Sequence, residues 1–270
     1  MSLVAAILLG AIQGLTEFLP VSSSAHLILA RAFFGWELQP EFALAFDVAL
    51  HIGTLAAILT FFRSEISAMV LAVPRLLTSQ PDPPVAMARL IAIGTIPVVI
   101  VVLLFNDIIE NVLRTPAVAA VALAVGAILM LVAERVGAQT RSENTLTWSD
   151  ALLIGVAQSA ALIPGMSRSG STITMGLFLG VRRDAAARFT FLLAIPAMLA
   201  AAAKESLELM KMQLPDGMMS LLAVGVVVSA LVGYITIKYF LRFLGGNRLD
   251  LFAAYRLILA AITVFWLVRH

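Results

Sequence analysis

Six long apolar stretches constrain the fold of this chain more than any other feature. Each approaches the roughly 20 residues that an α-helix needs to cross a bilayer. Hydrophobic residues make up 61% of the chain and charged residues 13%, where roughly a quarter is charged in soluble domains. The sequence therefore predicts an all-α polytopic membrane protein with a single integral domain over residues 1–270. The six stretches run approximately over 42–62, 86–105, 116–134, 187–204, 217–240 and 250–268.

Two further apolar stretches, 2–18 and 147–163, end close to Pro20 and Pro164. Proline removes a backbone donor and interrupts a helix, and polar residues follow both prolines. Non-helical backbone at membrane depth is tolerated only where protein or a water-filled cavity surrounds it. Each broken stretch therefore predicts a re-entrant helical hairpin, completed by residues 21–34 and 167–180. Two full spans joined by an exposed turn are the alternative, but the second pieces are short for a span.

An internal repeat relates the two halves of the chain. Phe46–Ile52 is similar to Phe189–Ile195, and Leu90–Gly94 is similar to Leu221–Gly225. Each copy would hold one hairpin and three spans, and an odd number of spans requires inverted topology. Inverted repeats bring two broken helices together near the bilayer midplane, where such proteins bind their ligands. The repeats are predicted at approximately 1–137 and 147–270.

The distribution of basic residues predicts an orientation. Most lysines and arginines lie in one set of connecting segments, and the positive-inside rule assigns that set to the cytoplasm. Both termini and the mouth of the first hairpin should then face outward. The basic segments are 63–89, 135–150, 180–188 and 238–249.

Arg168 is the most informative polar residue in the second hairpin. A charge near the bilayer centre costs about 2.5–3.5 kcal/mol on insertion scales, so its presence needs a reason. One explanation is a buried carboxylate that pairs with Arg168. The adjacent Ser167, Ser169 and Thr172 favour another, because a helix N-terminus offers free amide donors to an anion and arginine adds a planar fork suited to phosphate. We expect an anion site here.

The first hairpin carries groups suited to catalysis. Gln13 and Glu17 share one helical face, and Ser22, Ser23 and His26 open the next helix. A hydroxyl within reach of an imidazole is the minimum for an activated nucleophile. Glu17 could orient His26, act as a base or hold a divalent cation. Ser22 is alternatively only an N-cap.

Other ionisable residues within the spans have a structural interpretation. Asp47 and His51 lie one helical turn apart in the first span, and Arg256 lies in the last. An internal ion pair between Asp47 and Arg256 is favoured over a catalytic role. The net charge of +2 is too small to indicate nucleic acid, so none is expected as a partner, and the absence of cysteine excludes a thiol nucleophile or a thiolate metal site.

Two motifs resemble a known family. Gln13-Gly-Leu-Thr-Glu17 fits a (Glu/Gln)-x-x-x-Glu pattern, and Pro164-Gly-Met-Ser-Arg-Ser-Gly-Ser-Thr172 fits Pro-Gly-x-Ser-Arg-Ser-x-x-Thr. Both are signatures of the bacterial undecaprenyl-diphosphate phosphatases, also called the bacitracin-resistance family, and the similarity covers nearly the whole chain. The resemblance implies a multi-pass inner-membrane enzyme that converts undecaprenyl diphosphate to undecaprenyl phosphate and inorganic phosphate. It also implies dependence on magnesium or calcium.

The resemblance assigns roles to individual residues. Glu17 resembles the essential acid, Ser23 and His26 the nucleophile or base pair, and Arg168 the phosphate-binding arginine. Gln13 occupies a position that often holds a second glutamate, so metal binding by Glu17 and Gln13 is a weaker expectation. Phosphate binding is expected of Ser22, Ser167, Arg168, Ser169 and Thr172.

Several alternatives stay open at this point. Ser23 would attack phosphorus with help from His26 and Glu17, or His26 would attack directly. A polyprenyl-phosphate flippase or another secondary transporter with a midplane anion site would share the architecture. The expected partners are the polyprenyl diphosphate lipid, entering a site open to the outer side, and the bilayer. A homodimer is open beside a monomer.

Overall fold

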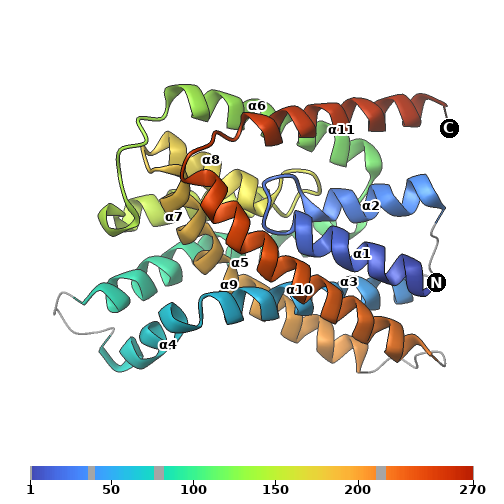
Figure 1. Cartoon of the computed structure of the whole chain (residues 1–270), viewed down its shortest axis with the longest axis horizontal. Helices are drawn as coiled ribbons and strands as arrows, with labels where there is room; N and C mark the ends of the chain where they lie inside the picture. Colours follow the sequence, from blue (N-terminus) through green and yellow to red (C-terminus); the bar gives the residue numbers. More distant parts are fainter. Residues whose placement is uncertain (1, 36–39, 76–81, 211–216, 270) are drawn as a thin grey trace.

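Helices dominate the computed structural model (Figure 1), which describes residues 2–35, 40–75, 82–210 and 217–269. The helices are α1 Leu3–Thr16, α2 Ser23–Phe34, α3 Pro40–Phe61, α4 Arg63–Ala72, α5 Pro83–Asn111, α6 Pro116–Val136, α7 Trp148–Ala160, α8 Arg168–Phe178, α9 Arg183–Leu209, α10 Met218–Leu244 and α11 Asp250–Arg269. Within these residues there is no β-strand, and one isolated bridge joins Arg141 and Val181. The predicted all-α class is confirmed.

The long helices confirm the expected membrane spans at the level of length and hydropathy. Five helices of the described chain are long and apolar enough to cross a bilayer, and a bent pair supplies a sixth candidate. That pair joins Ala45–Phe61 to Arg63–Arg75 at an angle of 79°. The sequence predicts a loop after residue 62, whereas the structure continues there as α4. The bend falls where the apolar α3 gives way to charged residues, among them Glu65, whose Oε1 accepts a hydrogen bond at 2.9 Å from Arg188 Nη2 of α9.

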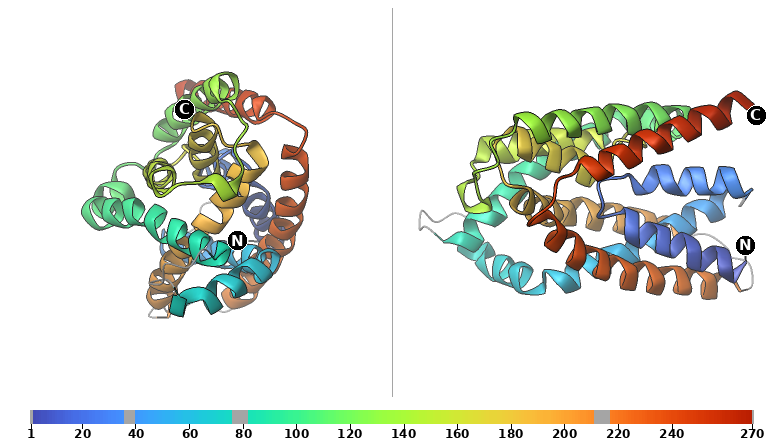
Figure 2. Two further views of the ribbon diagram at one scale, coloured as in Figure 1. Left: turned by 90° about the vertical axis from the view of Figure 1, so that its left-hand side faces the viewer. Right: turned by 45° about the horizontal axis from the view of Figure 1, so that its top comes forward.

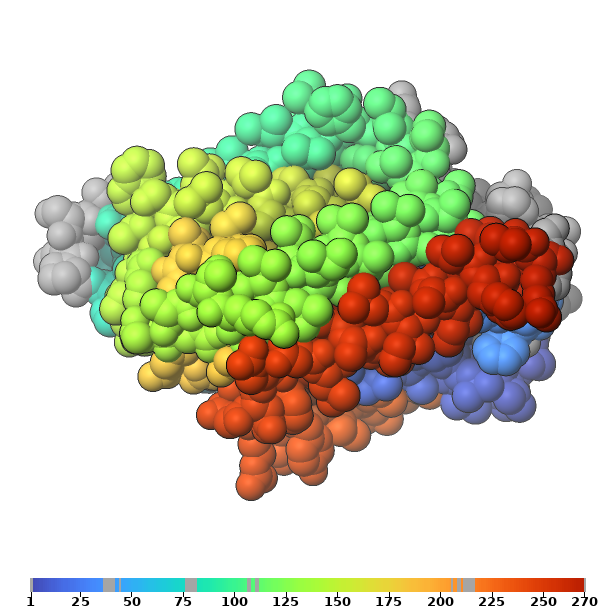
Figure 3. All heavy atoms as spheres, turned by 90° about the horizontal axis from the view of Figure 1, so that it is seen from above, coloured from blue at the N-terminus to red at the C-terminus, as the bar shows by residue number. Residues whose placement is uncertain are grey.

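The turns of the two hairpins are largely buried in the bundle, whereas the outer faces of α1 and α7 belong to its surface, with Ile7, Leu8, Leu153 and Val156 exposed. Glycines allow close packing of α1 on α10 and of α7 on α5. A Cβ added to Gly10 would lie 3.2 Å from the carbonyl oxygen of Gly225, and one added to Gly155 would lie 2.2 Å from that of Gly94. Small residues permit such close backbone approach between membrane helices. On another face, α6 and α11 lie side by side (Figure 3).

The two hairpins enter the bundle from opposite ends. The turn between α1 and α2 and the turn between α7 and α8 both lie near the middle of the long axis (Figure 1). Both ends of the chain lie at the end from which the first hairpin enters (Figure 2). Phe18 packs edge-to-face on Phe191 of α9 with centroids 5.5 Å apart, so the first turn rests against the aromatic core. The polar segments of both halves therefore meet inside the bundle.

Candidate functional site: a buried carboxylate, serine and arginine

Both hairpins restart their second helix with the same serine conformation. Ser22 and Ser167 have positive φ angles of 72° and 68°, which is uncommon for a residue other than glycine. Ser22 Oγ accepts from Ala25 N at 3.5 Å, and Ser167 Oγ accepts from Gly170 N at 3.1 Å. Each hydroxyl also lies 3.2 Å from that of the serine two residues later. The N-cap expectation for Ser22 is confirmed, and Ser167 caps α8 in the same way.

Hydrogen bonds join the two turns to each other. Gly165 N donates to Ser22 Oγ at 3.1 Å, and Ser169 Oγ donates to the carbonyl oxygen of Leu19 at 2.9 Å. Gly165 has a φ of +103°, and a Cβ at this position would lie 2.4 Å from the carbonyl oxygen of Ala119. Glycine is therefore required here for both conformation and space. These contacts fix the turns as one unit.

Arg256 of α11 binds both turns, and its hydrogen-bond partners differ from the predicted ion pair with Asp47. Its side chain is fully buried and donates to five backbone carbonyl oxygens, those of Pro20, Ala122, Leu123, Gly165 and Met166. The expected ion pair with Asp47 is wrong, because Asp47 pairs with Arg31 of α2 instead. Three of these acceptors lie at the turns, one in the first hairpin and two in the second, so one guanidinium ties both turns to α6.

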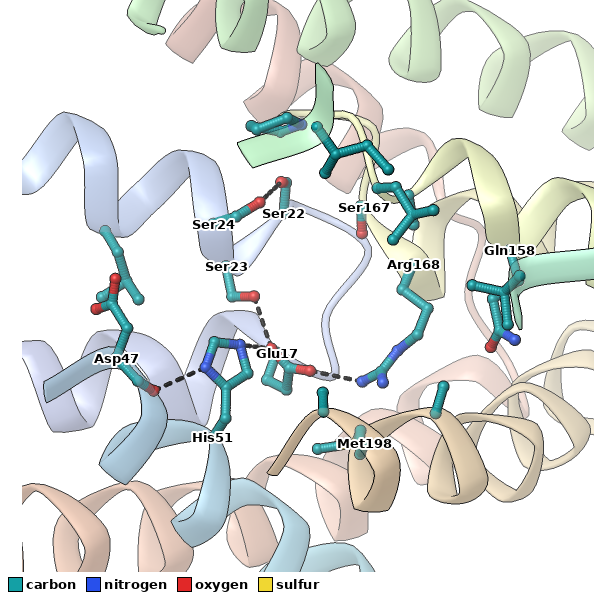
Figure 4. A pocket seen from close by; sticks show the side chains of 18 of the residues that line it. Glu17, Ser22, Ser23, Ser24, Asp47, His51, Gln158, Ser167, Arg168 and Met198 are labelled. Carbon is teal, nitrogen blue, oxygen red and sulfur yellow. Dashed lines mark hydrogen bonds and ion pairs between the residues drawn. The ribbon is translucent and has the colours of Figure 1, made fainter. Parts of the chain in front are cut away.

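Glu17 lies at the centre of the site (Figure 4). Arg168 Nη2 donates to its Oε1 at 2.5 Å, and Ser23 Oγ donates to its Oε2 at 2.6 Å. Gln13 Nε2 also donates to Oε2, at 2.9 Å. The Glu17 side chain is 7% exposed and that of Arg168 is 18% exposed. The tertiary structure thus brings together an acid, a hydroxyl and a cation from opposite halves of the chain.

A cavity of about 320 Å³ opens beside this cluster. Among the predicted site residues, it is lined by Glu17, Ser22, Ser23, Ser167 and Arg168. Gln13 is fully buried directly behind Glu17. The walls also carry apolar side chains such as Leu27, Val98 and Met198. A polar end inside an apolar wall suits an anion attached to a hydrocarbon chain.

His26 does not make the contact that the sequence predicts. Its Nδ1 lies 2.7 Å from the carbonyl oxygen of Ser22 and its Nε2 lies 2.7 Å from the hydroxyl of Tyr255. Since the carbonyl can only accept, Nδ1 carries a proton, and in the neutral imidazole Nε2 then accepts from the hydroxyl of Tyr255. His26 is absent from the cavity lining. The group that receives the Ser23 hydrogen bond is Glu17, whereas both ring nitrogens of His26 are taken up by Ser22 and Tyr255.

Two of the expected phosphate ligands also point elsewhere. Thr172 Oγ1 donates to the carbonyl oxygen of Arg168 at 2.7 Å and receives a hydrogen bond at 2.9 Å from Thr190. The Ser169 hydroxyl donates to the carbonyl oxygen of Leu19, as described above. Both side chains are buried outside the cavity lining. In this arrangement they support the shape of the turn and do not face the cavity.

Five polar lining residues fall outside the predicted set: Ser24, Asp47, His51, Arg114 and Gln158. His51 Nδ1 lies 2.8 Å from the carbonyl oxygen of Asp47, and its Nε2 lies 3.9 Å from Glu17 Oε2. The sequence does place Asp47 and His51 on one face of a span. An intramembrane ionisable residue is by default a candidate for function, and that rule applied to His51 would have found it.

The donor set is sparse for a metal ion held by the protein alone. No group of three or more histidine, cysteine, aspartate or glutamate side chains gathers in the described part of the chain. Glu17 is the carboxylate nearest Arg168 and Ser23, and Asp47 is committed to Arg31. Gln13 Oε1 is buried without a hydrogen-bond partner. This set fits a cation shared with phosphate oxygens, since Mg²⁺ commonly binds through one or two carboxylates plus substrate phosphates.

The fold and site define a class: polytopic helical membrane proteins with an internal cavity whose polar lining comes from the turns of two helical hairpins. The chain belongs to the family described as bacitracin resistance protein BacA, whose model matches residues 6–262. Relatives named undecaprenyl-diphosphatase come from Rubrobacter xylanophilus, 44% identical with 97% of each chain covered, and Thioalkalivibrio sulfidiphilus, 43% identical with 98% of this chain and 99% of the relative covered. Undecaprenyl-diphosphatase 2 of Stutzerimonas stutzeri is 45% identical, with 97% of each chain covered. The chain is a multi-pass membrane protein of this enzyme family.

Proposed function

We propose that this protein hydrolyses undecaprenyl diphosphate to undecaprenyl phosphate and inorganic phosphate, and so recycles the lipid carrier for cell-wall synthesis. The observation that carries the proposal is the contact of Ser23 and Arg168 with the same carboxylate, Glu17, at 2.6 and 2.5 Å. The names of the relatives, which cover nearly the whole chain, support the same substrate. They do not favour the flippase alternative.

Arg168 and Glu17 have different roles in the proposed phosphoryl transfer. Arg168 binds the terminal phosphate, because a guanidinium fork matches its oxygens and phosphoryl transfer depends mainly on positioning and charge stabilisation. The phosphate competes with Glu17 for this guanidinium. When Arg168 turns to the phosphate, Glu17 loses a stabilising partner and becomes a better acceptor for the proton of Ser23.

Ser23 is the proposed nucleophile. Its Oγ attacks the terminal phosphorus while its proton passes to Glu17 Oε2, and the bond to the bridging oxygen breaks to release undecaprenyl phosphate. Glu17 passes this proton to the departing undecaprenyl phosphate. Glu17 then takes a proton from the water that attacks the phosphoserine and returns it to Ser23 Oγ, so that inorganic phosphate leaves and both residues are restored. The 2.6 Å contact of Ser23 with Glu17 supports Glu17 as the base. His26 acts as a positioning residue at the start of α2, a role supported by its contact with the carbonyl of Ser22.

A divalent cation, magnesium or calcium, would be held by Glu17, by the buried amide oxygen of Gln13 and by the phosphates themselves. It would supply charge neutralisation for the diphosphate. Phosphate release from detergent-purified protein should fall on addition of a chelator and return with excess Mg²⁺ or Ca²⁺. A second copy of the chain as a partner stays a prediction, to be tested by measuring the mass of the protein in detergent.

We propose that the two hairpins are re-entrant and related by an inverted repeat, with six spans around them. The matching serines at the two turns support this arrangement. So does the reciprocal packing of glycines, since Gly10 of the first half meets Gly225 of the second, and Gly155 of the second half meets Gly94 of the first.

The proposed location is the bacterial inner membrane, with the cavity open to the outer side. The excess of basic residues at the end opposite the termini supports this orientation. The chain has no cysteine, so single cysteines report position directly. A membrane-impermeant thiol reagent on intact cells should label Arg269→Cys near the C-terminus and leave Asn247→Cys unlabelled. The reverse pattern would refute the orientation.

The decisive experiment measures inorganic phosphate released from undecaprenyl diphosphate by purified protein. Intact protein should release phosphate, and Arg168→Ala should not. A protein that releases none, yet moves the lipid between leaflets of a vesicle, would be a carrier.

A further inference from the structure

Gln158 is a buried polar side chain without a described partner. It lies in the last helical turn of α7, three residues before the C-cap Ala161, and is 2% exposed. Neither its Nε2 nor its Oε1 has a hydrogen-bond partner. An unsatisfied buried amide is costly, and such groups in a native protein call for an explanation. Because Gln158 also lines the cavity, a ligand in the cavity can provide one.

Comparison with the first hairpin explains why Gln158 has no partner. Gln13 precedes the capping Ser22 by the same number of residues as Gln158 precedes the capping Ser167. Gln13 donates to Glu17, four residues later on its own helix. Four residues after Gln158 the chain has Leu162, which cannot accept a hydrogen bond. The second hairpin thus keeps the amide and lacks the side chain that satisfies it in the first.

The position of Gln158 extends the polar lining past Arg168. In Figure 4, Arg168 lies between Glu17 and Gln158. A single phosphate held by Arg168 and facing Ser23 leaves Gln158 unused, whereas a diphosphate carries a second phosphate beyond the first. We propose that Gln158 binds this second phosphate, the one that bears the lipid. The inference rests on the proposed function. It makes Gln158 the residue that distinguishes a diphosphate from a monophosphate.

The chemistry of an amide suits this role. Its NH₂ group donates to a phosphate oxygen without adding charge, and its carbonyl oxygen accepts from a protonated phosphate or a bound water. A contact made equally in the ground state and the transition state raises affinity without changing kcat. Loss of Gln158 should therefore raise KM for the lipid diphosphate and leave kcat close to its original value.

The test compares inorganic diphosphate with inorganic phosphate as competitive inhibitors of full-length protein in detergent. Gln158→Met keeps the length of the side chain and removes both polar atoms. We expect roughly 10-fold weaker inhibition by diphosphate and no change for phosphate, since one hydrogen bond to a charged group is worth about that factor. Gln158→Glu should weaken diphosphate further through repulsion. Ser159→Ala is the matched control, because its hydroxyl bonds only to Gly155 O of the same helix and both constants should stay unchanged.

Stability separates binding from a structural role. Gln158→Met removes an unsatisfied amide, so the melting temperature should be maintained or rise while diphosphate binding weakens. Unchanged inhibition by diphosphate, or equal weakening for both anions, would overturn the inference. If the intact protein releases no phosphate from the lipid, the proposed function fails, and direct calorimetry of the two anions on the same variants still decides the role of Gln158.

Discussion

The two hairpins share a backbone design and differ in the side chains mounted on it. Ser22 and Ser167 cap their helices with nearly the same φ angle and the same hydrogen bond to the third following amide. The next residue is Ser23 in the first hairpin and Arg168 in the second, and both reach Glu17. The difference shows how one scaffold, used twice, supplies a nucleophile from one side and an anion-binding cation from the other.

The sharpest way to break this comparison is Ser23→Ala. We expect turnover to fall by about 10⁴-fold or more, as for other proteins whose nucleophile is removed. Ser23→Thr keeps a hydroxyl and should retain part of the activity. Phosphate release under saturating substrate measures both. Near-normal turnover by Ser23→Ala would refute the proposed nucleophile, and a trapped phosphohistidine would point to His26.

The equivalent change in the second hairpin is Arg168→Ala. Turnover should fall by about 10³-fold, because an arginine that stabilises a transferring phosphoryl group is commonly worth 10³–10⁵. Arg168→Lys keeps the charge but loses the planar fork, so it should recover only a fraction. The double variant Ser23→Ala, Arg168→Ala should be little worse than Ser23→Ala alone. Strictly multiplicative losses would show that the two hairpins act independently.

Arg256 serves both hairpins equally, so its removal should damage stability more than any single contact at the turns. Arg256→Met leaves buried carbonyl groups of both turns without a donor, at about 1–3 kcal/mol for each unsatisfied group. We expect a melting temperature in detergent lower by several degrees or failure to accumulate in the membrane. Arg242→Met, on the α10 end outside the turns, is the control. An unchanged melting temperature for Arg256→Met would mean that the turns hold together without it.

A smaller effect should distinguish the two capping serines. Each Ser→Ala change loses a cap worth about 1 kcal/mol. Ser22→Ala also leaves the buried amide of Gly165 without its acceptor, which adds about 1–3 kcal/mol. Thermal denaturation should therefore rank Ser22→Ala below Ser167→Ala in stability. The opposite order would show that the hydrogen bond between the turns contributes little.

The smallest effect concerns the base of the second hairpin, where Thr147 caps α7 and the Asp150 side chain completes a capping box by accepting from the Thr147 backbone N–H. Burial opposes ionisation of Asp150, but hydrogen bonds from Arg141 and Thr147 outweigh it and hold its pKa below the usual value. A depressed folded pKa stabilises above the unfolded pKa of about 3.9, and this stability is lost as pH falls through the folded value. Asp150→Asn should be less stable at pH 7 by at most about 1 kcal/mol. The difference should shrink below pH 4, and a constant difference would contradict the assignment.

The spans and both breaks follow from local sequence. Apolar stretches of bilayer length predict helices because unpaired backbone groups are too costly in lipid, and α6 and α11 begin where the sequence predicts. Pro20 and Pro164 mark the turns because proline cannot continue a helix. Glu17, Ser23 and Arg168 could be predicted as well, because polar groups beside such breaks need a function. The bend between α3 and α4 could not, since α4 is itself helical and its direction depends on its neighbours.

Tertiary structure alone decided which side chains meet. The sequence predicts a pair of Ser23 with His26 from their spacing and a pair of Asp47 with Arg256 from their opposite charges. In the structure Ser23 contacts Glu17, His26 contacts Tyr255, and Arg256 contacts backbone carbonyl oxygens. Spacing along a helix predicts which residues share a face. It does not predict which other helix packs against that face, because that helix lies far away in the chain. The sequence determined the spans, the breaks and most of the site chemistry. Only the folded bundle determined how Glu17 joins the two halves, because that contact crosses 151 residues of chain.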